Sequence, residues 1–170
     1  LAAGEKSVVE LFEVSKASVA YIFTESVQGQ LFFRRVAEGT GSGFIWDDAG
    51  HIVTNAHVVQ GASRIRVQLD DSEPLPARLV GIAPSYDLAV IRLVNKPASL
   101  RPIPVGTSGD LLVGQSVFAI GNPFGLSKTL TAGVISAVGR AIPSPTGQKI
   151  PGVIQVRVRA RVCGVGGRCV

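Results

Sequence analysis

The sequence has 170 residues, 46% of them hydrophobic, which is enough to bury a substantial core in one domain. Without residues 156–170, 13 Lys and Arg stand against 12 Asp and Glu, so the formal net charge of +5 comes mainly from the C-terminal end. The rest of the chain therefore lacks the basic footprint of a nucleic-acid-binding protein, and no apolar run is long enough for a membrane span.

The two ends of the chain carry unusual compositions. The sequence has no Met and begins at Leu1, so we expect it to belong to a longer translation product, with any targeting peptide upstream. Both cysteines, Cys163 and Cys169, lie near the C-terminus. The other residues therefore predict no disulfide framework and indicate no redox compartment.

The first half of the chain predicts a short helix and then strands. Residues 5–16 carry apolar side chains at helical spacing, which favours an amphipathic helix or a packing arm. Polar residues 25–30 predict a loop, and residues 47–50 predict a turn. About seven short strands with regular turn signals are typical of an all-β barrel or sandwich. The expected strands span residues 18–24, 31–36, 39–46, 51–54, 64–69, 76–82 and 88–94.

The alternating glycines of residues 39–43 allow two interpretations. Glycine-rich loops bind phosphates, but those fingerprints require a helix directly after the loop, and none is predicted here. Glycine inside a strand also marks a position where another part of the backbone approaches closely, often at a barrel corner. We therefore predict close packing rather than phosphate binding.

The second half predicts fewer strands. Residues 96–104 contain three Pro and predict a linker. Further strands are expected at 115–120, 129–138 and 150–155, with loops at 121–125 and 140–149. Three or four strands are too few to close a second barrel, so we expect that barrel to be incomplete.

One stretch carries the strongest chemical signal. His57 follows the apolar strand of residues 52–54, and Asp87 opens the next strongly apolar run, residues 88–91. A lone His there is open to a structural interpretation, as a core side chain bonded to a carbonyl. A buried Asp needs a partner, however, and a His–Asp pair supplies the base and its orienting group in a nucleophilic triad. His51, beside a turn, is interpreted as structural.

Residues 156–170 consist only of Val, Arg, Ala, Cys and Gly. This composition suggests read-through of GT- and GC-rich non-coding sequence, such as a retained intron, and a frameshift is an alternative. Two functional interpretations stay open: an Arg-rich arm for nucleic acid, and a metal or disulfide pair of Cys163 and Cys169. A single Cys pair without a flanking His is a weak metal signal.

Four motifs in this order resemble the HtrA/DegP family of serine endopeptidases. They are Thr54–Val59, Tyr86–Val90, Phe118–Gly125 and Thr131–Ser136. Residues 100–106 and 110–115 look most similar to the chloroplast Deg branch. The resemblance covers about residues 7–155.

The resemblance implies a trypsin-like double β-barrel with the site between the barrels. By position, His57 would be the general base and Asp87 its orienting group. The family implies degradation of unfolded or damaged proteins without a cofactor or metal, and trimer-based assembly. It places the protein in a chloroplast, in the thylakoid lumen, or in a bacterial periplasm. The implied organisation is an arm at 1–17, a first barrel at 18–95, a linker at 96–104, a partial second barrel at 105–155 and an aberrant tail at 156–170.

The sequence departs from the family where the nucleophile is expected. After a strand like residues 152–155, the family continues to a Gly-Asn-Ser-Gly-Gly element with the nucleophilic Ser and the oxyanion hole, which this sequence lacks. Ser108 lies in a similar motif at an ordinary turn, and Ser42 and Ser136 have no better claim. We therefore expect an inactive chain. The alternative is a proteolytically dead partner subunit that binds intact protomers.

Overall fold

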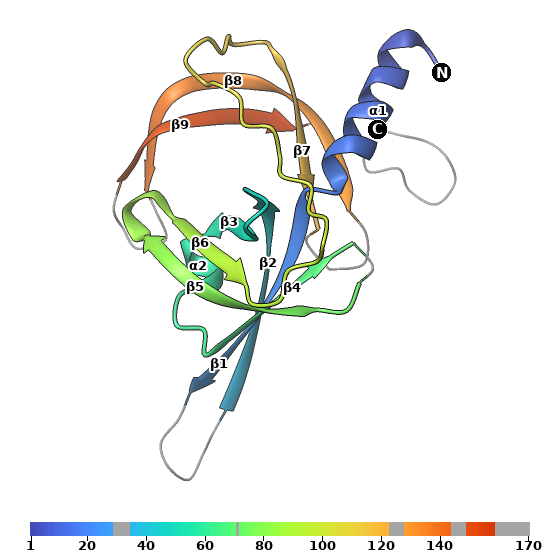
Figure 1. Cartoon of the computed structure of the whole chain (residues 1–170). Coiled ribbons are helices and arrows are strands. Elements are labelled where there is room, and N and C mark those ends of the chain that lie inside the picture. The colour runs from blue at the N-terminus through green and yellow to red at the C-terminus, as the bar shows by residue number, and fades with distance from the viewer. Residues whose placement is uncertain (29–34, 71, 123–127, 144–148, 159–170) are drawn as a thin grey trace, which may run out of the picture.

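The structure contains a closed barrel of six strands and a separate sheet of three strands. It is a computed structural model that describes residues 1–28, 35–70, 72–122, 128–143 and 149–158. Figure 1 shows the three-stranded sheet arching over one side of the barrel, with the N-terminal helix beside it. The expectation of an all-β fold with a first barrel that closes and a second that does not is confirmed.

The helices and strands follow one another in this order along the described residues. They are α1 (Ala3–Lys16), β1 (Val19–Gln28), β2 (Arg35–Ile45), β3 (His51–Asn55), α2 (Ala56–Val59), β4 (Arg64–Leu69), β5 (Leu75–Ala83), the 3₁₀ turn η1 (Pro84–Tyr86), β6 (Leu88–Leu93), β7 (Ser116–Gly121), β8 (Thr129–Pro143) and β9 (Lys149–Val158).

The barrel closes in the strand order β1-β2-β3-β6-β5-β4, and β4 returns to pair with β1. All neighbouring strands run antiparallel. The pairing of β3 with β6 joins segments far apart in the chain, with Ile52 opposite Ile91 and Asn55 opposite Leu88. This register brings the ends of both strands to one rim of the barrel.

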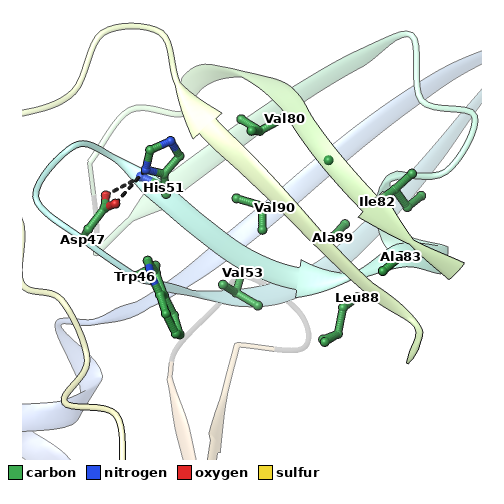
Figure 2. Close-up of a pocket in the computed structure, with 11 residues that line it drawn as sticks. Trp46, Asp47, His51, Val53, Val80, Ile82, Ala83, Leu88, Ala89 and Val90 are labelled. Atoms are coloured by element: carbon green, nitrogen blue, oxygen red, sulfur yellow. Dashed lines mark hydrogen bonds and ion pairs between the residues drawn. The ribbon is translucent and has the colours of Figure 1, made fainter. Parts of the chain in front are cut away.

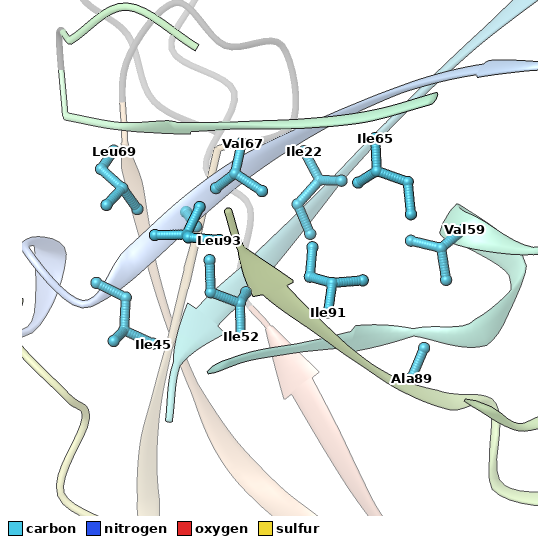
Figure 3. Close-up of a cluster of buried hydrophobic side chains, with 11 residues drawn as sticks. Ile22, Ile45, Ile52, Val59, Ile65, Val67, Leu69, Ala89, Ile91 and Leu93 are labelled. Atoms are coloured by element: carbon cyan, nitrogen blue, oxygen red, sulfur yellow. The ribbon is translucent and has the colours of Figure 1, made fainter. Parts of the chain in front are cut away.

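The barrel interior is filled by branched aliphatic side chains (Figure 3). Ile22, Ile52, Val67 and Ile91 are completely buried. The polar/apolar alternation of residues 64–69 predicts this arrangement, and Ile65, Val67 and Leu69 do point inward while Arg64 and Arg66 stay exposed. Each fully buried side chain of this size contributes about 1.5–3 kcal/mol to folding, so the barrel carries most of the stabilising burial.

The second sheet is open, in the order β7-β8-β9. Among its described residues only Ile135 joins the buried hydrophobic core, whereas Val134, Val138, Ile142 and Val156 are all more than 40% exposed. A sheet with neither closure nor a covering layer leaves apolar faces and strand edges in contact with solvent.

Polar contacts hold this sheet against the barrel. The backbone N–H of Asn122, just after β7, donates to Ser42 Oγ at 3.0 Å. Lys128 pairs with Asp70 at the end of β4, and the Lys128 side chain is nearly buried. In the predicted linker, the Ile103 N–H donates to the Ile45 carbonyl at 3.0 Å.

Several expected boundaries were wrong. The loop predicted at 25–30 is strand as far as Gln28, because β2 pairs with β1 along this whole length. The helix begins two residues earlier than predicted, and β8 and β9 take up both ends of the loop predicted at 140–149. Residues 31–34 of the second predicted strand lie outside the described residues, as do 144–148 and 159–170.

The close-packing prediction for residues 39–43 is confirmed. A Cβ added to Gly43 would lie 2.7 Å from the Val53 carbonyl oxygen and 2.9 Å from Ile22 Cδ1. At Gly41 a Cβ would lie 2.6 Å from a Val58 methyl group. The glycines of β2 therefore let the α2 segment and the β3 backbone approach the strand.

We expect the Gly43→Ala variant to lose about 1–3 kcal/mol of unfolding free energy, because the new methyl group meets a carbonyl fixed in the β2–β3 ladder. Urea unfolding would measure the loss. Gly106→Ala is the matched control, since open space surrounds Gly106, and it should change stability by less than about 0.5 kcal/mol. Equal stability of the two variants would contradict this account of β2.

Candidate active site

Two chain turns at the same rim of the barrel position the predicted pair. β3 ends at Asn55, and the single helical turn α2 starts at Ala56, so His57 stands one residue inside that turn. η1 ends at Tyr86, and Asp87 follows it directly before β6. Because Asn55 lies opposite Leu88, the two turns are side by side.

Asp87 adopts a left-handed backbone conformation, with φ of 51°. This conformation is uncommon for a residue with a side chain, and Asp is among those that tolerate it best. The Asp87 carbonyl accepts hydrogen bonds from the Ala56 N–H at 3.0 Å and from Asn55 Nδ2 at 3.1 Å. These bonds fix the turn and direct the carboxylate towards α2.

The Asp87 carboxylate binds His57 through both oxygens. Oδ2 lies 2.7 Å from His57 Nδ1, and Oδ1 accepts the backbone N–H of His57 at 3.0 Å. Asn55 Nδ2 also donates to Oδ2 at 3.2 Å. The imidazole is therefore held at one nitrogen and through its own backbone, so its orientation is well defined.

Electrostatics keep this carboxylate ionised. Burial raises the pKa of Asp87. Four other effects outweigh burial and lower the pKa overall: the hydrogen bonds from the His57 backbone and ring, the charge of the protonated ring, and the hydrogen bond from the Asn55 amide. An ionised carboxylate only accepts hydrogen bonds, so the neutral imidazole carries its hydrogen on Nδ1. Its Nε2 then has a free lone pair that can take a proton.

The His57 side chain is much more exposed than that of Asp87, as a general base that must reach a reacting molecule requires. The His57 side chain is 54% exposed, whereas that of Asp87 is 13% exposed. The imidazole is thus open to a reacting molecule, and the carboxylate behind it is shielded. This arrangement can accept a proton from a hydroxyl placed at Nε2.

No hydroxyl takes that place among the described residues. Ser42 Oγ is engaged by the Asn122 backbone, Ser108 stands in an exposed turn, and Ser136 lies within β8. None of the three is hydrogen-bonded to the His57 ring. The interpretation of all three as non-nucleophilic stays a prediction from the sequence.

His51 forms a second His–Asp contact elsewhere. Its Nδ1 lies 2.7 Å from Asp47 Oδ2, and its backbone N–H donates to Asp47 Oδ1 at 3.1 Å. Figure 2 shows this pair at one end of an apolar cavity of about 650 Å³ that also contains Val53 and Val90. The pair closes a turn of five residues, in agreement with the structural role predicted for His51.

Within the described ranges, no three His, Cys, Asp or Glu side chains gather into a group that could hold a metal ion. The helices described there are all too short or too polar to cross a bilayer.

Comparison with known proteins identifies the fold and the family. Residues 41–170 match the trypsin-like peptidase domain. The crystal structure of Deg5 superimposes with a TM-score of 0.77 at 41% identity, covering 100% of this chain and 81% of that one. The chain belongs to the HtrA/Deg family of trypsin-like serine proteases.

Relatives of this Deg chain are considerably longer. Protease Do-like 1, chloroplastic, of Arabidopsis thaliana is 50% identical over 167 residues, which cover 96% of this chain and 38% of the relative. Protease Do-like 5, chloroplastic, from the same plant is 44% identical over 86% of this chain and 47% of its own length. The chain thus spans less than half of either relative.

Sequence reasoning identified the His–Asp pair of this Deg chain but missed the groups that hold it. Asn55 contributes two hydrogen bonds to Asp87, and the helical turn α2 brings the His57 N–H to the carboxylate. A usable signal existed: an Asn at a strand end beside the turn that bears the imidazole. The left-handed backbone of Asp87 had no such signal.

The lowered pKa of Asp87 has a consequence for acid stability. A carboxyl whose folded-state pKa lies below its ordinary value of 3.8 stabilises the fold above that value, and this contribution is lost as the pH falls through the folded-state pKa. We therefore expect Asp87→Asn to lower the unfolding free energy by about 1–3 kcal/mol at pH 7, with the difference from wild type shrinking below about pH 4.

Urea unfolding of both proteins between pH 7 and pH 3 would measure this trend. Asp47, whose pKa is also lowered, is present in both proteins, so its contribution cancels in the difference. Asp48→Asn, at an exposed turn carboxyl, is the control and should stay within about 0.5 kcal/mol of wild type. A pH-independent deficit for Asp87→Asn would contradict the argument.

Proposed function

We propose that this chain is part of an HtrA/Deg serine endopeptidase that degrades unfolded or damaged proteins, with His57 as general base and Asp87 as its orienting group. The single observation that carries the proposal is the short contact between His57 Nδ1 and Asp87 Oδ2, 2.7 Å, beside an exposed imidazole. Membership in the family supports the same roles.

In this mechanism Nε2 of His57 removes the proton of a serine hydroxyl as it attacks the peptide carbonyl. The Asp87 carboxylate stabilises the imidazolium that forms and keeps its ring in place. His57 then returns the proton to the departing amine. No cofactor or metal takes part in these steps.

We further propose that the 170 residues alone do not cleave peptides. They contain no Gly-Asn-Ser-Gly-Gly element. Loss of the nucleophile alone costs on the order of a millionfold in rate, and an absent oxyanion hole removes much of what remains. The open sheet β7-β8-β9 supports this proposal, since further strands would be needed to close a second barrel around the site.

Compartment and assembly are proposed from the relatives. The names of Protease Do-like 1, 5 and 8 place those proteins in the chloroplast, which supports a chloroplast location for this chain. The thylakoid lumen is proposed from the family resemblance alone. A bacterial periplasm is the alternative, supported by a probable periplasmic DegP-like endoprotease of Halomonas elongata, 48% identical over 103 residues. Trimer-based assembly follows from the family resemblance.

A chimera tests the roles of the pair directly. Residues 1–155 would be joined to the remaining protease segment of Protease Do-like 1, and cleavage of unfolded casein would be followed. We expect cleavage, reduced on the order of 10⁴-fold or more by His57→Ala. His51→Gln is the matched control, because His51 has a similar Asp contact outside the proposed site, and it should keep most of the activity. Unchanged cleavage by the His57→Ala chimera would refute the assignment.

A fluorophosphonate probe, which labels activated serines, tests the unaltered chain. We expect no labelling above a heat-denatured sample, whereas intact Protease Do-like 1 should be labelled. Labelling that disappears in His57→Ala would mean that one of the present serines is a nucleophile. If the unlabelled chain co-purifies with intact Deg protomers, the alternative role as a proteolytically dead partner subunit is favoured. The completeness of the first barrel supports that alternative.

A further inference from the structure

Asn55 binds Asp87 at two places with one amide group. It is the last residue of β3, and its Nδ2 donates to the Asp87 carbonyl oxygen at 3.1 Å and to Asp87 Oδ2 at 3.2 Å. An amide nitrogen carries two hydrogens, so both bonds can exist together. A single side chain therefore fixes both the backbone turn at Asp87 and the rotation of its carboxylate.

The carboxylate oxygen that Asn55 holds is the one that meets the imidazole. Oδ2 of Asp87 lies 2.7 Å from His57 Nδ1, while Oδ1 accepts the His57 backbone N–H. Within the part of the chain that the structure describes, the other hydrogen bonds to this carboxylate come from His57 itself. Asn55 is thus the described donor that can direct Oδ2 independently of the ring.

The contact between ring and carboxylate needs this support. The His57 side chain is 54% exposed, so water can compete for its Nδ1 hydrogen. Asp87 also has φ of 51°, an unfavourable conformation for a residue with a side chain. The Ala56 N–H binds only the Asp87 carbonyl, and His57 binds only the carboxylate. Of these three consecutive residues, Asn55 alone reaches both parts of the aspartate.

We propose that Asn55 is a positioning residue for the proton transfer: it holds Asp87 Oδ2 against His57 Nδ1, so that the neutral ring keeps its hydrogen on Nδ1 and offers Nε2 as the base. The hydrogen bond made by one ring nitrogen decides which nitrogen carries the hydrogen. Burial raises the pKa of Asp87, and the bond from the Asn55 amide is one of the contacts that lower it, which favours the ionised, accepting form. This inference rests on the proposed function, because it treats His57 as the general base.

Nitrogen NMR of the isotope-labelled chain tests the proposal without requiring catalysis, because the ring nitrogen shifts report which nitrogen carries the hydrogen. The chain has only two His residues, so His51 serves as the internal reference. The spectra are recorded at about pH 9, well above the ordinary imidazole pKa of about 6.5. We expect the hydrogen on His57 Nδ1 in wild type, and a loss of about half of this tautomer or more in Asn55→Ala.

Two further variants separate the hydrogen bond from packing. Asn55→Asp keeps the shape of the side chain, but an ionised carboxylate has no hydrogen to donate, so this variant should lose the tautomer as Asn55→Ala does. Gln60→Ala, which removes an exposed amide directly after α2, is the matched control and should keep the tautomer. Asn55 is itself exposed, so its variants should fold, and unchanged His51 signals would confirm this.

The same variants in the casein-cleaving chimera connect the tautomer with the reaction. We expect Asn55→Ala to lower kcat by about 10- to 100-fold, the range for one hydrogen bond to a charged group, with KM within about twofold of the parent chimera. Gln60→Ala should leave kcat within about twofold.

The inference is overturned by a His57 tautomer that is unchanged in Asn55→Ala, by one that survives in Asn55→Asp, or by an unchanged kcat of the Asn55→Ala chimera. In each of these cases the His57→Ala chimera still decides the proposed function separately. If that chimera cleaves casein normally, the proposed function fails, and the inference fails with it whatever the tautomer shows.

Discussion

The antiparallel pairing of β3 with β6 is the constraint on which the candidate site depends. His57 and Asp87 are 30 residues apart in the chain, and only this register brings them to hydrogen-bond distance. A slip of either strand by one residue would also turn its inward side chain, Ile52 or Ile91, out of the core, because side chains alternate between the two faces of a strand. The hydrophobic core of the barrel therefore fixes the geometry of the polar pair at its rim.

The two His–Asp contacts of the chain show why surroundings matter more than the contact itself. In both contacts the distance from Nδ1 to a carboxylate oxygen is 2.7 Å, and in both the pKa of the carboxyl is lowered. At Asp47 the main cause is the hydrogen bond with the His51 ring. At Asp87 burial raises the pKa, and the hydrogen bonds with His57 and Asn55 together with the charge of the ring outweigh it. The Asp47–His51 contact closes a local turn. The Asp87–His57 contact instead joins two distant segments and leaves its imidazole facing solvent, with a cavity beside it.

The sequence predicted correctly those features that depend on neighbouring residues in the chain. The alternation of Arg64–Leu69 specified which side chains point inward, and an Asp at the head of the apolar run 88–91 predicted a partner for His57. The same reasoning failed where tertiary pairing decides. Polar residues 25–28 look like a loop, yet they form strand because β2 supplies hydrogen bonds to their backbone. The αL conformation of Asp87 likewise depends on donors from β3 and α2.

The barrel and the three-stranded sheet differ in how much apolar surface they bury, and so in whether they need further strands to be stable. The barrel places the proposed base and its orienting group at the rim of a closed core, so these groups need no further strands to hold them. The sheet β7-β8-β9 buries little of its own surface and is tied to the barrel by contacts such as Asn122 with Ser42. The proposed proton transfer thus belongs to the barrel, whereas bond cleavage needs a nucleophile from outside it. A chain of this kind can retain the His–Asp pair without cleaving a bond.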